Sequence, residues 1–126
     1  SADLDGLKHI NDTYGHTEGD NAISTVGRAL MTSAIQGEVC SRFGGDEFTV
    51  AGVIADMDDN YFENFRERFR EYLRQYNQIS RKPYLVESSI GFCFQKLEGE
   101  IDLDQMIKIA DDRMYEDKVQ RRKARR

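Results

Sequence analysis

The segment Arg42-Phe43-Gly44-Gly45-Asp46-Glu47-Phe48 predicts a β-hairpin in the middle of the chain. Apolar and β-branched residues lie on both sides of the two glycines, so Glu38–Phe43 and Phe48–Ile54 are predicted to be its strands. Glycines in a tight turn also let the backbone come close to a ligand. The same turn carries two adjacent acidic residues, Asp46 and Glu47, which makes it a candidate binding site.

Apolar residues at helical spacing predict three helices around this hairpin. One spans Asn21 to Ile35, and a second carries the aromatic residues from Phe62 to Tyr76, which we interpret as core. The third begins at Asp102, because Asp102 and Gln105 form the pattern of a helix capping box.

Two more strands are expected, Ala2–Leu4 at the start of the chain and Tyr84–Phe94 before the last helix. Gly91, inside the second of these, indicates a bulge or a close approach of another backbone. The order of elements favours an α+β sandwich, with helices packed on a mainly antiparallel sheet. Since the first strand is so short, we expect either a trimmed chain or a partner that supplies the missing strand.

Length and composition indicate one ordinary globular domain over residues 1–126, with 39% hydrophobic residues and a single proline. The sequence has neither an apolar run long enough to cross a bilayer nor a signal peptide, so we expect no membrane contact by this segment. Cys40 and Cys93 lack the spacing of a zinc site and are expected to be free thiols.

The charge of the chain is unevenly distributed. The net charge is −5, and without the five basic residues of the last six it would be −10. An acidic body argues against a general nucleic-acid surface, which needs a basic face to contact phosphates. Acidic proteins that handle phosphates commonly use bound metal ions. The basic residues of the end are Arg121, Arg122, Lys123, Arg125 and Arg126.

Two acidic pairs are candidates for such a metal site. Asp3 and Asp5 flank Leu4 at the end of the first strand, and Asp46 and Glu47 lie in the hairpin turn. If the fold brings them together, their carboxylates can hold Mg²⁺, which favours carboxylates and phosphate oxygens. Either pair taken alone is more typical of a solvated turn.

Four segments carry motifs whose order and spacing belong together: Asp3–Asp20 (DLDGLKHINDTYGHTEGD), Arg42–Phe48 (RFGGDEF), Ser89-Ile90-Gly91, and Ala110-Asp111-x-x-Met114-Tyr115-x-x-Lys118. Together they resemble the GGDEF family of diguanylate cyclases, and the resemblance covers essentially the whole chain. It implies a ferredoxin-like, polymerase-palm-like fold. It also implies an enzyme that condenses two GTP into cyclic di-GMP and releases two pyrophosphates, with one GTP on each of two domains that meet face to face.

The resemblance also implies a metal site and catalytic residues. Asp3 and Asp46 would be carboxylate ligands of Mg²⁺, with Mn²⁺ as an alternative, and the Leu4 carbonyl would assist. Glu47 would be a further ligand or would help to deprotonate the attacking ribose 3′-hydroxyl, two roles that are compatible. Asp46 and Glu47 are therefore the expected catalytic residues.

For the substrate, the resemblance implies that Asn11 and Asp20 bind the guanine edge, which adenine cannot match. The remaining GTP contacts that it implies are the backbone N–H groups of Gly6 and Leu7, the cations Lys8, Lys118 and Arg122, and the unhindered glycines Gly44 and Gly45.

Three features depart from the family pattern. The product-inhibition motif RxxD is replaced by Ile35-Gln36-Gly37-Glu38, so feedback inhibition there is not expected. Arg121 stands where the family commonly has glycine, which leaves the position of Arg122 open. The family's usual N-terminal lead-in, with a helix and most of the first strand, is missing from the sequence.

The family implies a bacterial, cytoplasmic domain that works as a homodimer. It also implies a sensor domain on the N-terminal side of the parent protein. Whether the parent protein has a membrane anchor elsewhere is left open. Two alternatives to the cyclase remain. One is a catalytically silent GTP-binding module that regulates a neighbouring domain. The other is a cyclase that makes a different cyclic nucleotide. Asp20 argues against this second alternative, because an acid at the base-binding position favours guanine.

Overall fold

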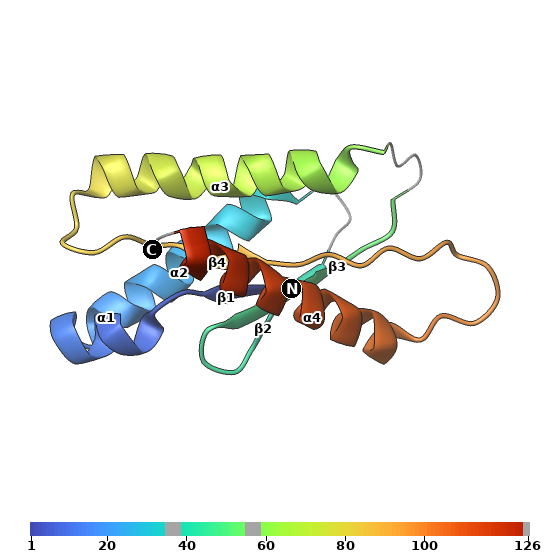
Figure 1. The fold of residues 1–126 in the computed structure, drawn as a ribbon, viewed down its shortest axis with the longest axis horizontal. Helices are drawn as coiled ribbons and strands as arrows, with labels where there is room; N and C mark the ends of the chain where they lie inside the picture. The colour runs from blue at the N-terminus through green and yellow to red at the C-terminus, as the bar shows by residue number, and fades with distance from the viewer. Residues whose placement is uncertain (35–38, 55–58, 125–126) are drawn as a thin grey trace.

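The computed structural model describes residues 1–34, 39–54 and 59–124, and only the backbone of residues 39–43. Ile35 and Glu38, on which the expectation about product inhibition rests, lie outside the described residues. Figure 1 shows the elements in chain order. They are β1 (Ala2–Leu4), α1 (Leu7–Tyr14), α2 (His16–Ser33), β2 (Val39–Phe43), β3 (Glu47–Ala51), α3 (Tyr61–Ser80), β4 (Ser88–Ile90) and α4 (Leu103–Ala124).

The described strands form one sheet in the order β2-β3-β1-β4, and every neighbouring pair is antiparallel. β1 lies inside the sheet, where Ala2 is opposite Phe48 on one side and Ile90 on the other. Asp3 is opposite Glu47 by the same register. The expected α+β fold with an antiparallel sheet is confirmed, and it places the two acidic segments side by side.

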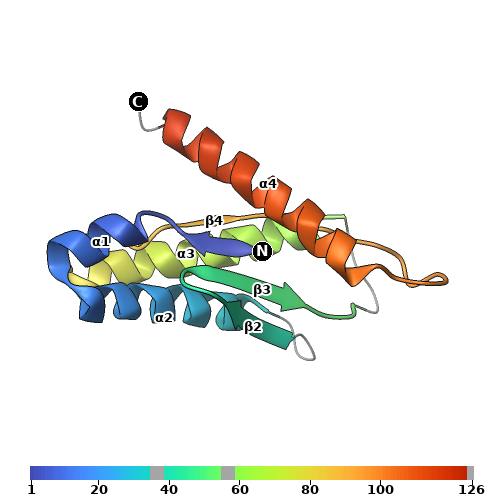
Figure 2. The same cartoon turned by 90° about the horizontal axis from the view of Figure 1, so that it is seen from below.

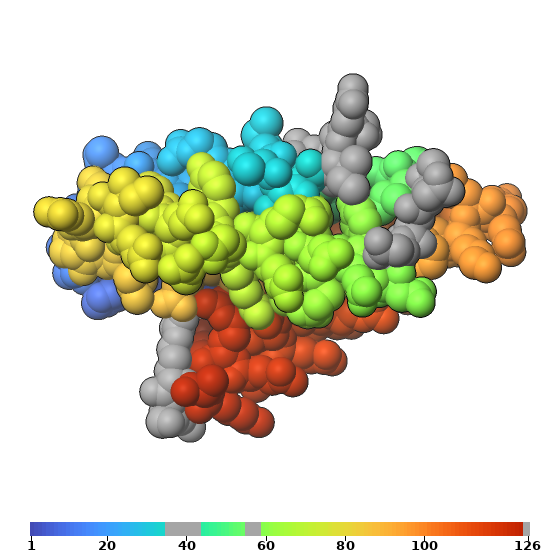
Figure 3. All heavy atoms as spheres, turned by 90° about the horizontal axis from the view of Figure 1, so that it is seen from above, coloured from blue at the N-terminus to red at the C-terminus, as the bar shows by residue number. Residues whose placement is uncertain are grey.

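The helices cover both faces of the sheet. Figure 2 shows α2 and α3 together on one face and α4 crossing the other. In the space-filling view of Figure 3, α3 spans the near surface and α4 emerges beyond it. The predicted aromatic helix is confirmed: Phe65, Phe69 and Leu73 recur every four residues and are buried against the core. Burying side chains of this size stabilises the fold by about 1.5–3 kcal/mol each.

α4 packs directly against β4. A Cβ atom on Gly91 would lie 2.2 Å from the backbone nitrogen of Met114 and 2.3 Å from the carbonyl oxygen of Ala110, so the expected close approach at Gly91 is confirmed. One edge of β4 would otherwise face solvent, and α4 side chains cover it. The carboxylate of Asp117 accepts a hydrogen bond from the Ile90 N–H at 3.0 Å, and Arg121 donates to the Ser88 carbonyl.

Several predicted boundaries were wrong. The strand predicted over Tyr84–Phe94 is only Ser88–Ile90, because its partner β1 offers just three residues for pairing. The strand predicted over Phe48–Ile54 is Glu47–Ala51. The helix predicted from Asn21 begins at His16 and ends at Ser33, because its first turn is polar and shows no apolar periodicity. The hairpin's first strand runs over Val39–Phe43 in the described residues.

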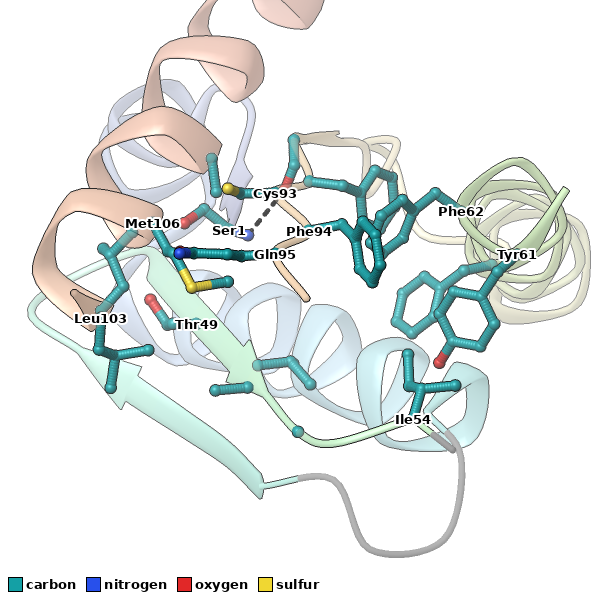
Figure 4. A pocket seen from close by; sticks show the side chains of 18 of the residues that line it. Ser1, Thr49, Ile54, Tyr61, Phe62, Cys93, Phe94, Gln95, Leu103 and Met106 are labelled. Carbon is teal, nitrogen blue, oxygen red and sulfur yellow. Dashed lines mark hydrogen bonds between the residues drawn. The ribbon is translucent and has the colours of Figure 1, made fainter. Parts of the chain in front are cut away.

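A cavity of about 940 Å³ opens between β3, the chain after β4, and the starts of α3 and α4. Figure 4 shows its apolar wall, with Phe62 and Phe94 facing Met106 and Leu103 across the space. The half-buried free thiol of Cys93 lies on its rim, whereas the side chain of Cys40 is outside the description. None of the described helices is long and apolar enough to span a lipid bilayer.

Candidate active site

Asp3 and the hairpin turn meet at one end of the sheet. The N–H of Leu4 donates to the Asp46 carbonyl at 3.1 Å, and the N–H of Glu47 donates to the Gly44 carbonyl at 3.3 Å. Gly44 has a φ of 56°, which favours glycine at this position. These backbone bonds fix the turn beside β1, so the two acidic pairs of the sequence are neighbours as expected.

The Asp3 carboxylate is partly buried, and its pKa is raised. Its side chain is 16% exposed, and its Oδ2 accepts a hydrogen bond from Lys118 Nζ at 2.7 Å. Burial raises the pKa of Asp3 to about 6; the hydrogen bond from Lys118 opposes the shift and the neighbouring Asp46 carboxyl reinforces it. The other oxygen, Oδ1, is buried and has no hydrogen-bond partner among the described residues.

Glu47 has a second acidic neighbour, Asp111 on α4, in addition to Asp46. Burial raises its pKa, and the nearby carboxylate of Asp111 on α4 raises it further. Among the described residues, no three His, Cys, Asp or Glu side chains are close enough together to hold a metal ion. The structure therefore does not bring Asp3, Asp46 and Glu47 into one ligand group: Lys118 occupies one oxygen of Asp3, and Glu47 faces Asp111.

The donor atoms nevertheless suit a divalent cation. Carboxylate oxygens are the ligands that Mg²⁺ prefers. A cation that binds between clustered carboxylates also offsets the repulsion between their negative charges. The unsatisfied Oδ1 of Asp3 is the observation that points to a missing partner. These residues are of the chemical types that would hold a divalent cation, and the expected ligand set of Asp3, Asp46, Glu47 and the Leu4 carbonyl stays a prediction.

The turn from β1 to α1 exposes backbone donors. Gly6 precedes α1 in the left-handed conformation, with a φ of 72°, and no side chain caps the helix. The first N–H groups of an uncapped helix attract anions, so the expected phosphate role of Gly6 and Leu7 fits this geometry. Lys8 is 90% exposed and pairs with Asp12 at 2.8 Å, so it lies on the surface of α1 in this state.

Asn11 and Asp20 lie on the two packed helices α1 and α2. Asn11 rests against Gly19: a Cβ atom on Gly19 would be 1.7 Å from the Asn11 Oδ1 atom. Asp20, the next residue along α2, is exposed. The structure places Asn11 at the contact between α1 and α2, in the space left by the missing side chain of Gly19, and Asp20 on the exposed surface next to that contact.

The remaining expected contact residues differ in exposure and in the contacts that they make. Lys118 is half-buried and paired with Asp3, whereas Arg122 is exposed near the end of α4. Gly44 and Gly45 are exposed, and no atom lies within 4 Å of where their Cβ atoms would be. The hairpin turn is thus open to a ligand.

Comparisons with known proteins identify the family. The sequence profile described as "Diguanylate cyclase, GGDEF domain" matches residues 1–124. The chain belongs to the GGDEF family. It is similar to the diguanylate cyclase DgcM of Escherichia coli, 33% identical over 113 residues that cover 90% of this chain and 26% of the relative. The diguanylate cyclase DosC of the same species is 28% identical over 90% of this chain and 24% of the relative.

Solved structures confirm the fold of this GGDEF domain. An EAL/GGDEF domain protein from M. capsulatus has a TM-score of 0.75 at 27% identity, covering 94% of this chain and 76% of that one. The GGDEF domain of DgcB from Caulobacter crescentus, solved in complex with c-di-GMP, has a TM-score of 0.75 at 25% identity, covering 93% of this chain and 68% of that one. The GGDEF domain spans about a quarter of the length of the curated relatives it matches.

Sequence reasoning missed three residues of this site. Gly19 could have been found as a glycine inside a helix, which commonly has a packing or functional reason. Asp111 lies in a quoted motif but received no role, although it faces Glu47. Arg121 counts in the sequence as one of the terminal basic residues and as a departure from the family pattern, yet it pairs with Asp5 at 2.6 Å.

Proposed function

We propose that this GGDEF domain is an active diguanylate cyclase, which condenses two GTP into cyclic di-GMP and two pyrophosphates in a Mg²⁺-dependent reaction. The observation that carries the proposal is the partly buried Asp3 carboxylate, which lies beside Asp46 at the open hairpin turn and whose Oδ1 has no hydrogen-bond partner among the described residues. Backbone donors at the start of α1 and the Lys118 cation lie at the same end of the sheet.

In this proposal Asp3, Asp46 and the Leu4 carbonyl hold the metal. A bound divalent ion would neutralise phosphate charge and make the ribose hydroxyl easier to ionise. Glu47 accepts the proton of the 3′-hydroxyl, and its raised pKa makes it a stronger base than an ordinary carboxylate. The freed 3′-oxygen forms a bond to the α-phosphorus of the other GTP, and the bond from that phosphorus to the β-phosphate oxygen breaks. Pyrophosphate leaves with the bonding electrons, and the same exchange in the opposite direction closes the ring.

The substrate contacts follow from the positions of the other side chains. The Asn11 amide can donate and accept at the guanine edge, and the Asp20 carboxylate can accept from the ring N–H and the exocyclic amine. Adenine would leave these polar groups unpaired, which makes the discrimination steep. Gly6 and Leu7 bind phosphate oxygens through their N–H groups. Lys8, Lys118 and Arg122 neutralise the triphosphate, and Gly44 and Gly45 leave room for it.

One chain offers a single GTP site in this arrangement, so turnover requires two chains face to face. We infer a homodimer in the bacterial cytoplasm, brought together by a sensor domain elsewhere in the parent protein. Regulation by a partner has a parallel in a similar structure, the diguanylate cyclase SiaD of Pseudomonas aeruginosa in complex with its activator SiaC. That structure is 26% identical to this chain with a TM-score of 0.74, and the match covers 94% of this chain and 45% of that one.

A second candidate is a silent GTP-binding module. The observation in its favour is that the acids are not assembled as a metal site, since Lys118 pairs with Asp3 and Glu47 faces Asp111. The intact Gly44-Gly45-Asp46-Glu47-Phe48 segment argues for the cyclase instead, because it retains every acid that the chemistry needs.

The deciding experiment incubates the purified chain at high concentration with GTP and Mg²⁺ and separates the nucleotides by chromatography. We expect cyclic di-GMP from the chain itself, none from Glu47→Ala, and an unchanged yield from Glu67→Ala, which removes an exposed acid of α3. GTP binding without product, even when a dimerising coiled coil is fused to the chain, would establish the silent module. ATP that competes with GTP would point to another cyclic nucleotide.

A further inference from the structure

Arg121 connects α4 to the two chain segments beside the candidate site. Its Nη1 donates to Asp5 Oδ2 at 2.6 Å and to the Ser88 carbonyl, and its Nη2 donates to Glu87 Oε2 at 2.8 Å. The Arg121 side chain is only 21% exposed and that of Asp5 only 15%. Such partly buried, multiply bonded arginines hold two segments in one geometry, because the guanidinium is planar and its donors are fixed in direction.

Asp5 is itself held firmly. Its Oδ1 accepts a hydrogen bond from Ser89 Oγ at 2.8 Å, and its backbone N–H donates to the Glu87 carbonyl at 2.8 Å. The next residue is Gly6, which begins the turn into α1. The contacts that hold the Asp5 carboxylate in place therefore also hold the first N–H groups of α1 in place.

Lys118 lies one helical turn before Arg121 on the same face of α4. It pairs with Asp3, and Arg121 pairs with Asp5, two residues further along the chain. Two cations of one helix thus contact the strand and the turn that follows it. This arrangement sets how far Lys118 lies from the start of α1.

We propose that Arg121 is a positioning residue for the triphosphate of GTP. Its ion pairs with Asp5 and Glu87 hold α4 at a fixed distance from the Gly6–Leu7 turn. The phosphates therefore meet Lys118 on one side and the helix N–H groups on the other. The inference rests on the proposed function for the identity of the ligand, whereas the clamp between α4 and the turn stands on the contacts alone.

The test compares Arg121→Gln with Arg121→Lys and with Arg70→Gln. Arg70 of α3 pairs with Asp117 of α4 at 2.8 Å, so its loss removes an ion pair of α4 that does not reach the turn. Amide hydrogen exchange of residues 5–10 reports on the turn without any ligand, and calorimetric titration reports the GTP affinity.

We expect faster exchange in residues 5–10 for Arg121→Gln and no change there for Arg70→Gln, even if both variants lose similar thermal stability. Arg121→Gln should also bind GTP roughly tenfold more weakly, because small misplacements of binding groups are costly. Arg121→Lys should recover part of both effects, since a lysine keeps the charge but reaches fewer acceptors. Should Arg121→Gln fail to fold, Asp5→Ala removes the same contact from the other side, because it deletes both carboxylate acceptors.

The possible outcomes distinguish a failure of the clamp, which is the contact of Arg121 with Asp5 and Glu87, from a failure of the proposed function. Unchanged exchange in residues 5–10 of Arg121→Gln or Asp5→Ala overturns the clamp between α4 and the turn, whatever the GTP affinity is. Faster exchange with an unchanged GTP affinity overturns the positioning role. If the parent chain binds no GTP while Arg121→Gln still exchanges faster in the turn, the proposed function fails and the clamp stands.

Discussion

The side chain of Asn11 occupies the space that a side chain on residue 19 would need, so this position accepts glycine. A Cβ atom there would lie 1.7 Å from Asn11 Oδ1 and 2.8 Å from its Cγ, so Gly19→Ala forces the Asn11 amide into another rotamer. Asn11 is half-buried and can turn away, while alanine in a helix gains about 0.5–1 kcal/mol over glycine. We expect unchanged or slightly raised thermal stability and GTP binding weakened on the order of tenfold, measured by thermal unfolding and calorimetry.

Ser24→Ala is the matched control for Gly19→Ala. Ser24 is exposed on the same helix, so the substitution tests helix propensity without touching Asn11. It should leave GTP binding unchanged. Equal GTP affinity in Gly19→Ala and the parent chain would show that Asn11 does not bind the base from the position seen here.

At the scale of elements, the contact between α4 and β4 depends on Gly91. The atoms that a Cβ would meet, Met114 N at 2.2 Å and Ala110 O at 2.3 Å, are backbone atoms of a helix and cannot rotate away. Gly91→Ala must therefore push α4 off the sheet, and we expect a loss of about 3 kcal/mol in the free energy of unfolding, measured by chemical denaturation.

Gly45→Ala supplies the control for Gly91→Ala. No atom lies within 4 Å of its Cβ position, and Gly45 is not among the glycines with positive φ, so its stability should stay within about 0.5 kcal/mol of the parent. A Gly91→Ala protein as stable as this control would mean that α4 packs against β4 less closely than described.

The helices and strands were predictable from the sequence only in part. The stripe of α3 is predictable because Phe65, Phe69 and Leu73 repeat at helical spacing. β4 was predicted too long because strand length depends on the partner strand, which local preference cannot indicate. In the site, the motifs identify the residue types, but the pairing of Lys118 with Asp3 joins positions 115 residues apart, so only the fold reveals it.

At the scale of the whole molecule, the proposed reaction needs two chains, and charge opposes their encounter. The chain carries a net charge of −5, and the five basic residues near its end leave the rest at −10. Two acidic bodies repel one another, and salt screens that repulsion over about 8–10 Å at physiological ionic strength. Pairing of free chains should therefore be weak, and the rate of cyclic di-GMP formation per chain should rise with protein concentration.

A dimerising coiled coil fused after the exposed end of α4 should remove this dependence on concentration. The fusion supplies a high local concentration of the second chain, so the rate per chain should become constant and exceed that of the free chain at low concentration. The same fusion with prolines in the coiled coil is the control, because it adds equal mass without pairing the chains. The rates come from chromatography of the nucleotides, and light scattering gives the oligomeric state. A rate per chain that stays constant while light scattering shows only monomers would contradict a reaction shared between two domains, since one chain would then complete both bonds on its own.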